Sequence, residues 1–569
     1  MLISSVAAAS CGKTKDAPAD TRAAKIEPGV VDAIKAQLSA RPAFLSEGAR
    51  NEKAWKAVRQ FYEKRAFAPA WIDGRRPTGD FDELLEALRT ADREGLDPSM
   101  YGTQAIVAHR QNASGKRFSR DAFAKDDVDD IDVWSTWAFM SYADDLSDGI
   151  TNFAQVQGTW GMKPEPVDLV AALDSALASG EIRKALEEAA PRHPEYLALK
   201  KALVAHRQIA TWGGWPAIPA QIKLKAGGSD PAVPALRKRL ALTHDFKGSA
   251  DDASTVYDGT LVDAVKLFQL RHGLAEDGVV AGKTVAAMNV PVSKRIRQIE
   301  LNMERWRWMP RELGANHARV NIPEYRLDLW EGDQIALTMR VVVGSPDNRT
   351  PIFSDQMTHI VFSPYWNVPP SIASEETLPA VQDDPSYLAR NNLEVVGTSG
   401  SVVDPGAVNW SDASSYRFRQ KPGTSNSLGL VKFMFPNQHN VYLHDTPADA
   451  LFARPARALS HGCVRVEQPT KLARYLLRDS AKWDEDRIDA AMHAGTESHV
   501  KLDKAIPVYL LYMTARASHS DGAMHFRDDV YGHDVQQGRS FDQQLAKLQQ
   551  RAAELNARLS GSVSAPGGR

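Results

Sequence analysis

The chain has 569 residues, of which 43% are hydrophobic and 25% are charged, and its formal net charge is −2. This length predicts several domains, because a single hydrophobic core rarely extends beyond about 300 residues. The near-neutral charge gives no support for nucleic-acid binding, which usually needs a basic surface. The sequence contains no run of eighteen apolar residues, so it predicts no membrane-spanning helix.

The N-terminal residues 1–45 are expected to be the remnant of an export signal followed by a tether. The run "MLISSVAAASC" ends at Cys11 and resembles a bacterial lipoprotein cleavage site, although the basic start of an export signal is missing. We therefore expect export to the periplasm and a membrane anchor through a lipidated Cys11, with a disordered leader as the alternative. Residues 12–45 are rich in Ala, Lys, Asp and Pro, a composition typical of a tether.

Residues 50–210 are expected to form a helical scaffold domain. In "FDELLEALRTADREGLDP" the apolar residues recur at spacings of three and four, which places them on one face of a helix. Gly95 and Pro98 are expected to end that helix. The segments "DDIDVWSTWAFMSYADDLSDG" and "VDLVAALDSALASGEIRKALEEAA" show the same periodicity, and we assign their aromatic and apolar stripes to the core.

Residues 230–292 are expected to form a compact unit of three helices. The first begins at "PALRKRLAL", the second ends at Gly273, and the third runs from about Thr284 to Met288. On the basis of "AVKLFQLRHGL", "DGVV" and the turn before Thr284, this unit resembles the three-helix peptidoglycan-binding domain of cell-wall enzymes. The resemblance implies binding to the cell wall, and a unit that only packs against its neighbours is the alternative.

From Arg319 onward the hydrophobic pattern changes to the alternation of β-strands, and "EGDQ" indicates the turn of a hairpin. Further strands are expected in "HIVFSPYWNVPPSI", "GLVKFMFPNQHNVYLHDT" and "AIPVYLLYMTA". Between them, residues 371–427 form a long polar section, and a loop of that length is usually functional or mobile. We expect a substrate lid there. Residues 536–569 predict a solvated amphipathic helix and a disordered tail.

Cys463 is one of only two cysteines, and the other is far away in the sequence, so no disulfide framework is expected. A free thiol has a pKa of about 8.5 and needs a base to become a strong nucleophile. His444 lies nineteen residues upstream of this thiol and His461 lies two residues upstream. Three interpretations follow: a buried structural cysteine, a metal site with both histidines, and nucleophilic catalysis. The spacing is unlike the common zinc motifs, so we expect no metal.

Other residues near the cysteine suit a catalytic site. Gly462 allows the backbone to approach a substrate, and the N–H groups at this turn are candidates for an oxyanion hole. Arg465 offers a permanent charge for a substrate carboxylate. Tyr442 lies two residues before His444 on the same predicted strand, so their side chains are expected on the same face. Tyr442 and Trp366 are candidate substrate contacts, with core packing as the alternative for both.

The segment "HDTPADALFARPARALSHGCVRVEQP" resembles the active-site motif of bacterial L,D-transpeptidases. The matching positions are His444, Ser460, His461, Gly462, Cys463 and Arg465. The stretches "NMERWRWMP", "SPYWNVPPSI" and "DVYGHD" extend the resemblance to the large Gram-negative members, over about residues 50–535. This implies a multidomain α+β protein with a mostly-β catalytic domain at residues 315–535.

The resemblance also implies a reaction. The Cys463 thiolate attacks the third residue of a peptidoglycan stem tetrapeptide, usually diaminopimelate, and the terminal D-alanine leaves. The side-chain amine of a second stem then attacks the thioester and forms a 3→3 cross-link. His444 is the implied base, while Ser460 and His461 order the loop. No metal or organic cofactor is implied, and carbapenems are expected to acylate the thiol.

The sequence leaves the acceptor of the acyl group open. Water would give an L,D-carboxypeptidase, and a lipoprotein lysine would give an enzyme that attaches or releases lipoproteins. A cell-wall-binding scaffold with a silent catalytic domain is a further alternative, although the complete motif around Cys463 argues against it.

Overall fold

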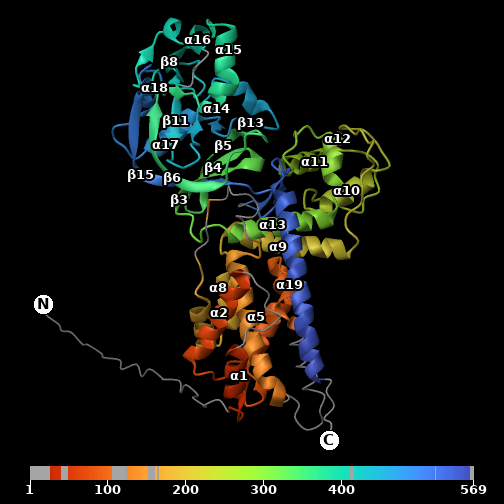
Figure 1. The fold of residues 1–569 in the computed structure, drawn as a ribbon. Coiled ribbons are helices and arrows are strands. Elements are labelled where there is room, and N and C mark those ends of the chain that lie inside the picture. Colours follow the sequence, from red (N-terminus) through yellow and green to blue (C-terminus); the bar gives the residue numbers. More distant parts are fainter. Residues whose placement is uncertain are drawn as a thin grey trace, which may run out of the picture.

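The computed structural model describes residues 26–39, 49–104, 122–123, 125–151, 161–162, 166–410, 415–518 and 521–563. Cys11 lies outside these residues, so its lipidation stays a prediction. Figure 1 shows a helical domain at the bottom, a mostly-β domain at the top and a smaller helical unit beside their junction. The predicted fold class, a multidomain α+β protein with its helices first and its sheet last, is therefore confirmed.

The helical domain is built around one buried helix. Its α-helices are α1 (Val30–Ser39), α2 (Ala49–Lys64), α3 (Gly79–Arg89), α5 (Val128–Asp148), α7 (Leu169–Ser179), α8 (Ile182–Ala189) and α9 (Pro194–Thr211). Almost every residue of α5 is buried, and α1, α2, α7 and α8 pack around it. Its buried Asp132 accepts hydrogen bonds from the Tyr62 hydroxyl (2.6 Å) and the Trp71 N–H (2.8 Å). These bonds offset the cost of burying a carboxylate.

Short elements join the helices of this domain. They are β1 (Ile72–Asp73), β2 (Arg76–Pro77), and the 3₁₀ turns η1 (Ala91–Glu94), η2 (Pro98–Tyr101) and η3 (Lys125–Asp127). Helix α3 ends at Arg89, earlier than the sequence pattern predicts, and η1 continues the chain to Gly95. This glycine has a φ of 73° and closes the turn in the left-handed conformation that glycine adopts most easily.

Helix α1 belongs to the helical domain, although the composition of residues 12–45 predicts a tether. Val30, Ile34 and Leu38 are buried in the domain core. They recur every four residues, which places them on one face of the helix. The tether prediction is therefore wrong for residues 30–39, where apolar spacing outweighs the polar composition.

The smaller helical unit has its own core. It contains α10 (Val233–Leu242), α11 (Gly259–Arg271) and α12 (Gly282–Met288), as the sequence predicts. Gln269 of α11 is buried and holds the turn between α11 and α12. Its Nε2 donates to Asp277 Oδ1 (2.8 Å), and its Oε1 accepts from the N–H of Gly278 (2.8 Å).

Helix α13 (Val292–Arg307) joins the helical domain to the mostly-β domain. It packs against α9, against α19 (His533–Val563) and against β16 (Ala515–Ala517), which pairs with β17 (Met524–Phe526). Asn302 of α13 is fully buried, accepts from the N–H of Thr514 (3.0 Å) and donates to its hydroxyl (2.9 Å). Arg305 donates to the carbonyl of Tyr512 (3.0 Å). These bonds hold the two domains together.

Helix α19 is also more than the solvated helix that its charged sequence predicts. Phe541 and Leu548 are buried in the large core, and the helix packs along α13 and η2. It is the long blue helix that runs beside the helical domain in Figure 1. No helix in the described ranges is both long enough and apolar enough to span a bilayer.

The mostly-β domain is a sheet that closes on itself. Its strands are β3 (Asn316–Asn321), β4 (Arg326–Glu331), β5 (Gln334–Gly344), β6 (Phe353–Phe362), β11 (Val431–Met434), β12 (Leu443–His444), β13 (Ala458–Ser460), β14 (Val464–Val466) and β15 (Ser498–Leu511). They follow the order β13-β5-β14-β12-β11-β6-β15-β3-β4, and β4 also pairs with β5. The predicted hairpin is confirmed, since Glu331 pairs with Gln334 at the turn.

Two helices and two short turns complete this domain: α17 (Pro469–Leu477), α18 (Glu485–Met492), η4 (Ile322–Glu324) and η8 (Asp449–Ala453). The apolar residues of α17 and α18 join those of the strands in one core, including Leu472 and Ile488. Successive side chains of a strand point to opposite faces of the sheet, so the strand residues alternate between this core and an outer face.

Residues 366–410 and 415–420 form a folded insertion, whereas the polar sequence of residues 371–427 predicts a long loop. A separate sheet in the order β7-β10-β8-β9 packs with short helical segments around Val381, Val395 and Phe418. The apolar residues are too scattered for a sequence pattern, because each strand has only two to four residues. The insertion lies at the top of Figure 1.

The elements of the insertion are β7 (Trp366–Asn367), α14 (Pro370–Ile372), the π-helical turn η5 (Ala373–Thr377), α15 (Leu378–Asp383), α16 (Tyr387–Arg390), β8 (Leu393–Val396), β9 (Val402–Val403), η6 (Pro405–Ala407) and β10 (Arg417–Gln420).

Candidate active site

The pairing of β12 with β14 assembles the candidate site. The two strands are parallel, with Leu443 opposite Val464 and His444 opposite Arg465. The N–H of Val464 donates to the carbonyl of Tyr442 (3.1 Å), which extends the pairing by one residue. Leu443 and Val464 point into the core, so the residues that alternate with them lie on the outer face. Four predicted site residues share this outer face, the β12–β14 face: Tyr442, His444, Cys463 and Arg465.

Cys463 is a free, half-buried thiol. Its Sγ lies 3.8 Å from the carbonyl oxygen of Asn440. Burial raises the pKa of this thiol, while the backbone N–H of Tyr442, the Tyr442 hydroxyl and the charge of Arg465 act in the opposite direction. The thiol is therefore protonated at neutral pH, and the groups that would stabilise its thiolate are already in place.

His444 is buried and neutral. Burial, together with the charges of Arg465 and Lys432, lowers its pKa to about 3. Its Nδ1 lies 2.5 Å from the carbonyl oxygen of Asp445. A carbonyl can only accept, so Nδ1 carries the hydrogen and Nε2 keeps the lone pair that takes up a proton. The site therefore presents a neutral thiol and a neutral imidazole on adjacent strands.

Ser460 shapes the turn that precedes the thiol. Its buried hydroxyl donates to the carbonyl of Cys463 (2.6 Å) and accepts from the N–H of Gly462 (3.2 Å). Gly462 has a φ of 116°, a conformation that other residues rarely adopt. The predicted role of Ser460 in ordering the loop agrees with these bonds. The N–H of Gly462 is occupied by Ser460, so this group differs from the free oxyanion donor that the sequence suggests.

Two residues that were not predicted as site residues from the sequence, Thr350 and Tyr531, hold the turn through hydrogen bonds. Thr350 is buried; its hydroxyl donates to the carbonyl of Gly462 (2.7 Å) and accepts from the N–H of Gly344 (2.8 Å). Tyr531 donates to the carbonyl of Gly344 (2.6 Å) and accepts from the N–H of Thr350 (3.2 Å). Tyr531 belongs to the quoted "DVYGHD" stretch, which was the available sequence signal for this contact.

His461 faces the insertion. Its Nε2 lies 2.8 Å from Oε1 of Glu376, which belongs to η5. Both side chains are about half exposed. The insertion therefore contacts the motif directly, and His461 is oriented toward a carboxylate of another segment rather than serving as a second base on the β12–β14 face.

Trp366 does not lie on that face. It belongs to β7, pairs with Gln420 of β10 and packs against the small core of the insertion. Trp366 therefore fits the alternative in which it packs in a core and does not contact the substrate. Tyr442, in contrast, contacts the site directly: its ring lies 5.8 Å from that of His444 in an edge-on geometry, and its hydroxyl lowers the pKa of Cys463.

The metal alternative finds no support in the geometry. Within the described residues, no group of three or more His, Cys, Asp or Glu side chains is placed to hold a metal ion. His461, the third ligand that the sequence offered, is paired with Glu376.

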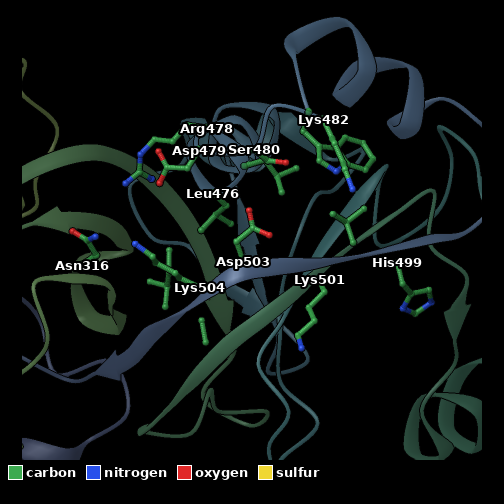
Figure 2. Close-up of a pocket in the computed structure, with 15 residues that line it drawn as sticks. Asn316, Leu476, Arg478, Asp479, Ser480, Lys482, His499, Lys501, Asp503 and Lys504 are labelled. Atoms are coloured by element: carbon green, nitrogen blue, oxygen red, sulfur yellow. The ribbon is translucent and has the colours of Figure 1, made fainter.

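A separate pocket of about 650 Å³ lies between the end of α17 and β15. It opens where β15 departs from β6, between Lys501 and Ile506. Figure 2 shows side chains of both charge signs around it, among them Arg478, Asp479 and Asp503. No predicted site residue lines this pocket, so the candidate chemistry belongs to the β12–β14 face.

Removal of the Tyr442 hydroxyl is expected to make Cys463 less reactive. In Tyr442→Phe the thiolate loses a hydrogen bond, so the pKa of Cys463 rises further and its thiolate fraction at a given pH falls. Alkylation by iodoacetamide, followed by intact mass over a pH series, should show a profile shifted to higher pH. An unchanged profile would contradict the Tyr442–Cys463 contact.

Removal of the Thr350 hydroxyl is expected to loosen the turn before the thiol. Thr350→Val keeps the shape of the side chain but leaves the N–H of Gly344 unsatisfied, which costs roughly 1–3 kcal/mol. We expect a lower melting temperature and an altered alkylation rate of Cys463. Thr350→Ser keeps both bonds and is the matched control. Equal behaviour of the two variants would show that the hydroxyl does not hold the turn.

Comparison with known proteins assigns a family to three parts of the chain. Residues 56–203 match a "Scaffold domain", residues 229–288 match a "Putative peptidoglycan binding domain", and residues 315–497 match the "L,D-transpeptidase catalytic domain". The last range contains β12, β14 and all eight predicted site residues.

One curated relative is the "Putative L,D-transpeptidase" of Haemophilus influenzae, 34% identical over 283 residues. The match covers 48% of this chain and 57% of the relative.

Solved structures match as well, and two of them are L,D-transpeptidases. An L,D-transpeptidase from Mycobacterium smegmatis is 11% identical and covers 35% of this chain and 58% of its own, with a TM-score of 0.17. An L,D-transpeptidase from Xylanimonas cellulosilytica is 16% identical and covers 52% and 100%, with a TM-score of 0.17. The domain matches show that the chain carries a scaffold domain, a peptidoglycan-binding domain and an L,D-transpeptidase catalytic domain, in this order.

Proposed function

We propose that this protein forms 3→3 cross-links in peptidoglycan through a thioester on Cys463. The observation that carries the proposal is the pairing of β12 with β14 inside an L,D-transpeptidase catalytic domain. A thiol and a neutral imidazole share one face there, with a phenol beside them, and a nucleophile next to a base is what acyl transfer by a cysteine requires.

In the first step the thiol proton moves to Nε2 of His444 and Sγ attacks the carbonyl of the third residue of a stem tetrapeptide. The tetrahedral intermediate collapses, the bond to the terminal D-alanine breaks, and the imidazolium returns the proton to the leaving amine. The low pKa of His444 suits this return, because its protonated form is a strong acid. Tyr442 stabilises the thiolate by its hydrogen bond.

In the second step the side-chain amine of a diaminopimelate on a second stem attacks the thioester. His444 takes up the proton of that amine, the thiolate of Cys463 leaves, and the imidazolium then returns the proton to the thiolate, which restores the neutral thiol and the neutral imidazole. The reaction needs no cofactor, since the energy of the broken amide bond is kept in the thioester. The peptidoglycan-binding domain supports a polymeric substrate, because it would keep a sugar strand close to the catalytic domain.

The acceptor distinguishes this proposal from related reactions of the same site. Water as acceptor would give a tripeptide product, and a lipoprotein lysine would give a protein–peptidoglycan conjugate. We further propose that the protein acts in the periplasm and that carbapenems acylate Cys463, since both follow from the family chemistry.

Substitution of Cys463 tests the nucleophile. We expect Cys463→Ala to abolish cross-linking of purified tetrapeptide muropeptides, because no other group on the β12–β14 face can form the thioester. Chromatography with mass spectrometry identifies the products, and a carbapenem adduct in the intact mass should occur in the wild-type protein alone. Tetrapeptide turnover by folded Cys463→Ala would refute the mechanism, while tripeptide from the wild-type protein would identify a carboxypeptidase.

Substitution of His444 tests the base. His444→Gln keeps a side chain of similar length but cannot accept the thiol proton, and we expect acylation to slow by about a hundredfold or more. The rate of carbapenem adduct formation measures this step without the acceptor. His461→Gln serves as the control, because His461 faces Glu376. A larger loss in the control than in His444→Gln would reverse the two roles.

A further inference from the structure

One row of paired residues crosses five strands of the closed sheet. Arg465 pairs with His444, His444 with Lys432, Lys432 with Val361, and Val361 with His499. Paired residues project from the same face of a sheet, and adjacent strands are about 4.8 Å apart. The row therefore places the buried base of the site between two permanent or near-permanent cations, Arg465 on one side and Lys432 on the other.

Both cations are partly buried and poorly compensated. Burial lowers the pKa of Lys432 and of Arg465. Within the described part of the chain, neither side chain forms an ion pair, and Nε of Arg465 is buried without a hydrogen-bond partner. A partly buried cation without a counter-ion raises the free energy of the folded protein, and an anionic group of a bound ligand would offset this cost. The arrangement therefore suits an anionic ligand.

The neighbouring acid does not fill this role. The charge of Glu497 raises the pKa of Lys432, but its carboxylate accepts from the N–H of Tyr365 (2.7 Å) and lies 3.3 Å from Nε2 of His499. Toward the candidate active site, the ammonium of Lys432 lies 5.9 Å from the centre of the Tyr442 ring. The same tyrosine therefore contacts this cation and lowers the pKa of Cys463.

We propose that Lys432, with Arg465, binds a carboxylate of the donor stem and selects donors that carry it. This inference rests on the proposed function and adds the recognition of the leaving end. Arg465, which belongs to the row of paired residues, is two residues from Cys463 along the chain, a separation of about 7 Å in an extended strand. The α-carboxylate of the terminal residue lies one residue beyond the attacked carbonyl, about 3.8 Å away along the chain, and long cationic side chains span the remainder.

The side-chain carboxylate of diaminopimelate is the second source of the same chemistry. The geometry favours the terminal carboxylate, because only that group has a fixed short separation from the bond that breaks. Lys432 is a binding residue in this scheme, and its charge also keeps the pKa of His444 low. A loss of rate in a Lys432 variant is therefore not diagnostic by itself, and the test must change the ligand as well as the protein.

The test measures binding by calorimetry on Cys463→Ala, which cannot turn over, with three forms of the stem tetrapeptide. These are the free acid, the peptide amidated at its terminal carboxylate, and the peptide amidated at the side-chain carboxylate of diaminopimelate. We expect the terminal amide to bind about tenfold more weakly than the free acid, as for the loss of a charged hydrogen bond. The side-chain amide should bind like the free acid.

The same titrations on Cys463→Ala with Lys432→Met should show weak binding of all three peptides, with no further loss on terminal amidation. Lys432→Arg keeps the charge and should restore the preference for the free acid. If side-chain amidation weakens binding instead, the terminal assignment is overturned. If amidation of the terminal carboxylate leaves the affinity unchanged, or if the preference persists in Lys432→Met, the proposal is wrong.

These outcomes are separate from the proposed reaction. Cross-linking by the wild-type protein tests the reaction, whereas the inactive background tests recognition of the carboxylate. Circular dichroism and melting temperature confirm that each variant is folded. Wild-type turnover without a carboxylate preference would overturn the role of Lys432 alone, and a carboxylate preference without turnover would overturn the reaction alone.

Discussion

The candidate site depends on one contact, the parallel pairing of two very short strands. β12 has two residues and β14 has three, and neither could hold its partner in isolation. The closed sheet holds them, because β11 pairs with β12 on one side and β5 pairs with β14 on the other. The register of this pairing decides that His444 and Cys463 face the same side. A shift by one residue would turn one of them into the core.

The charge state of the site follows from its burial. The half-buried thiol and the buried imidazole are both held neutral, and the ion pair that catalysis needs would form only when a substrate excludes water and presents its carbonyl. Burial is the main reason why the histidine stays unprotonated, and the positive charges of Arg465 and Lys432 lower its pKa further. They also provide an attraction for an anionic peptide, so the same two side chains tune the base and suit the substrate.

The supporting contacts come from distant parts of the chain. Thr350, from the connection between β5 and β6, and Tyr531, from the segment before α19, hold the backbone on which Gly462 turns. Glu376 reaches His461 from the insertion. The C-terminal segment is in turn fixed by α13, whose buried Asn302 and Arg305 bond the chain after β15. The domain junction and the catalytic turn are therefore parts of one hydrogen-bonded structure.

The sequence by itself determined the order of the domains, the hairpin of β4 and β5 and the thiol–histidine motif, because these depend on local spacing and residue type. Four other features were decided by the tertiary structure. Helix α1 and the apolar face of α19 are stabilised by a core that local composition does not reveal, and the insertion folds around apolar residues too scattered to form a pattern. The position of Lys432 beside His444 depends on strand register, which is set by long-range pairing and closure of the sheet. Residue chemistry could thus be identified from the sequence, whereas the arrangement of its charges required the fold.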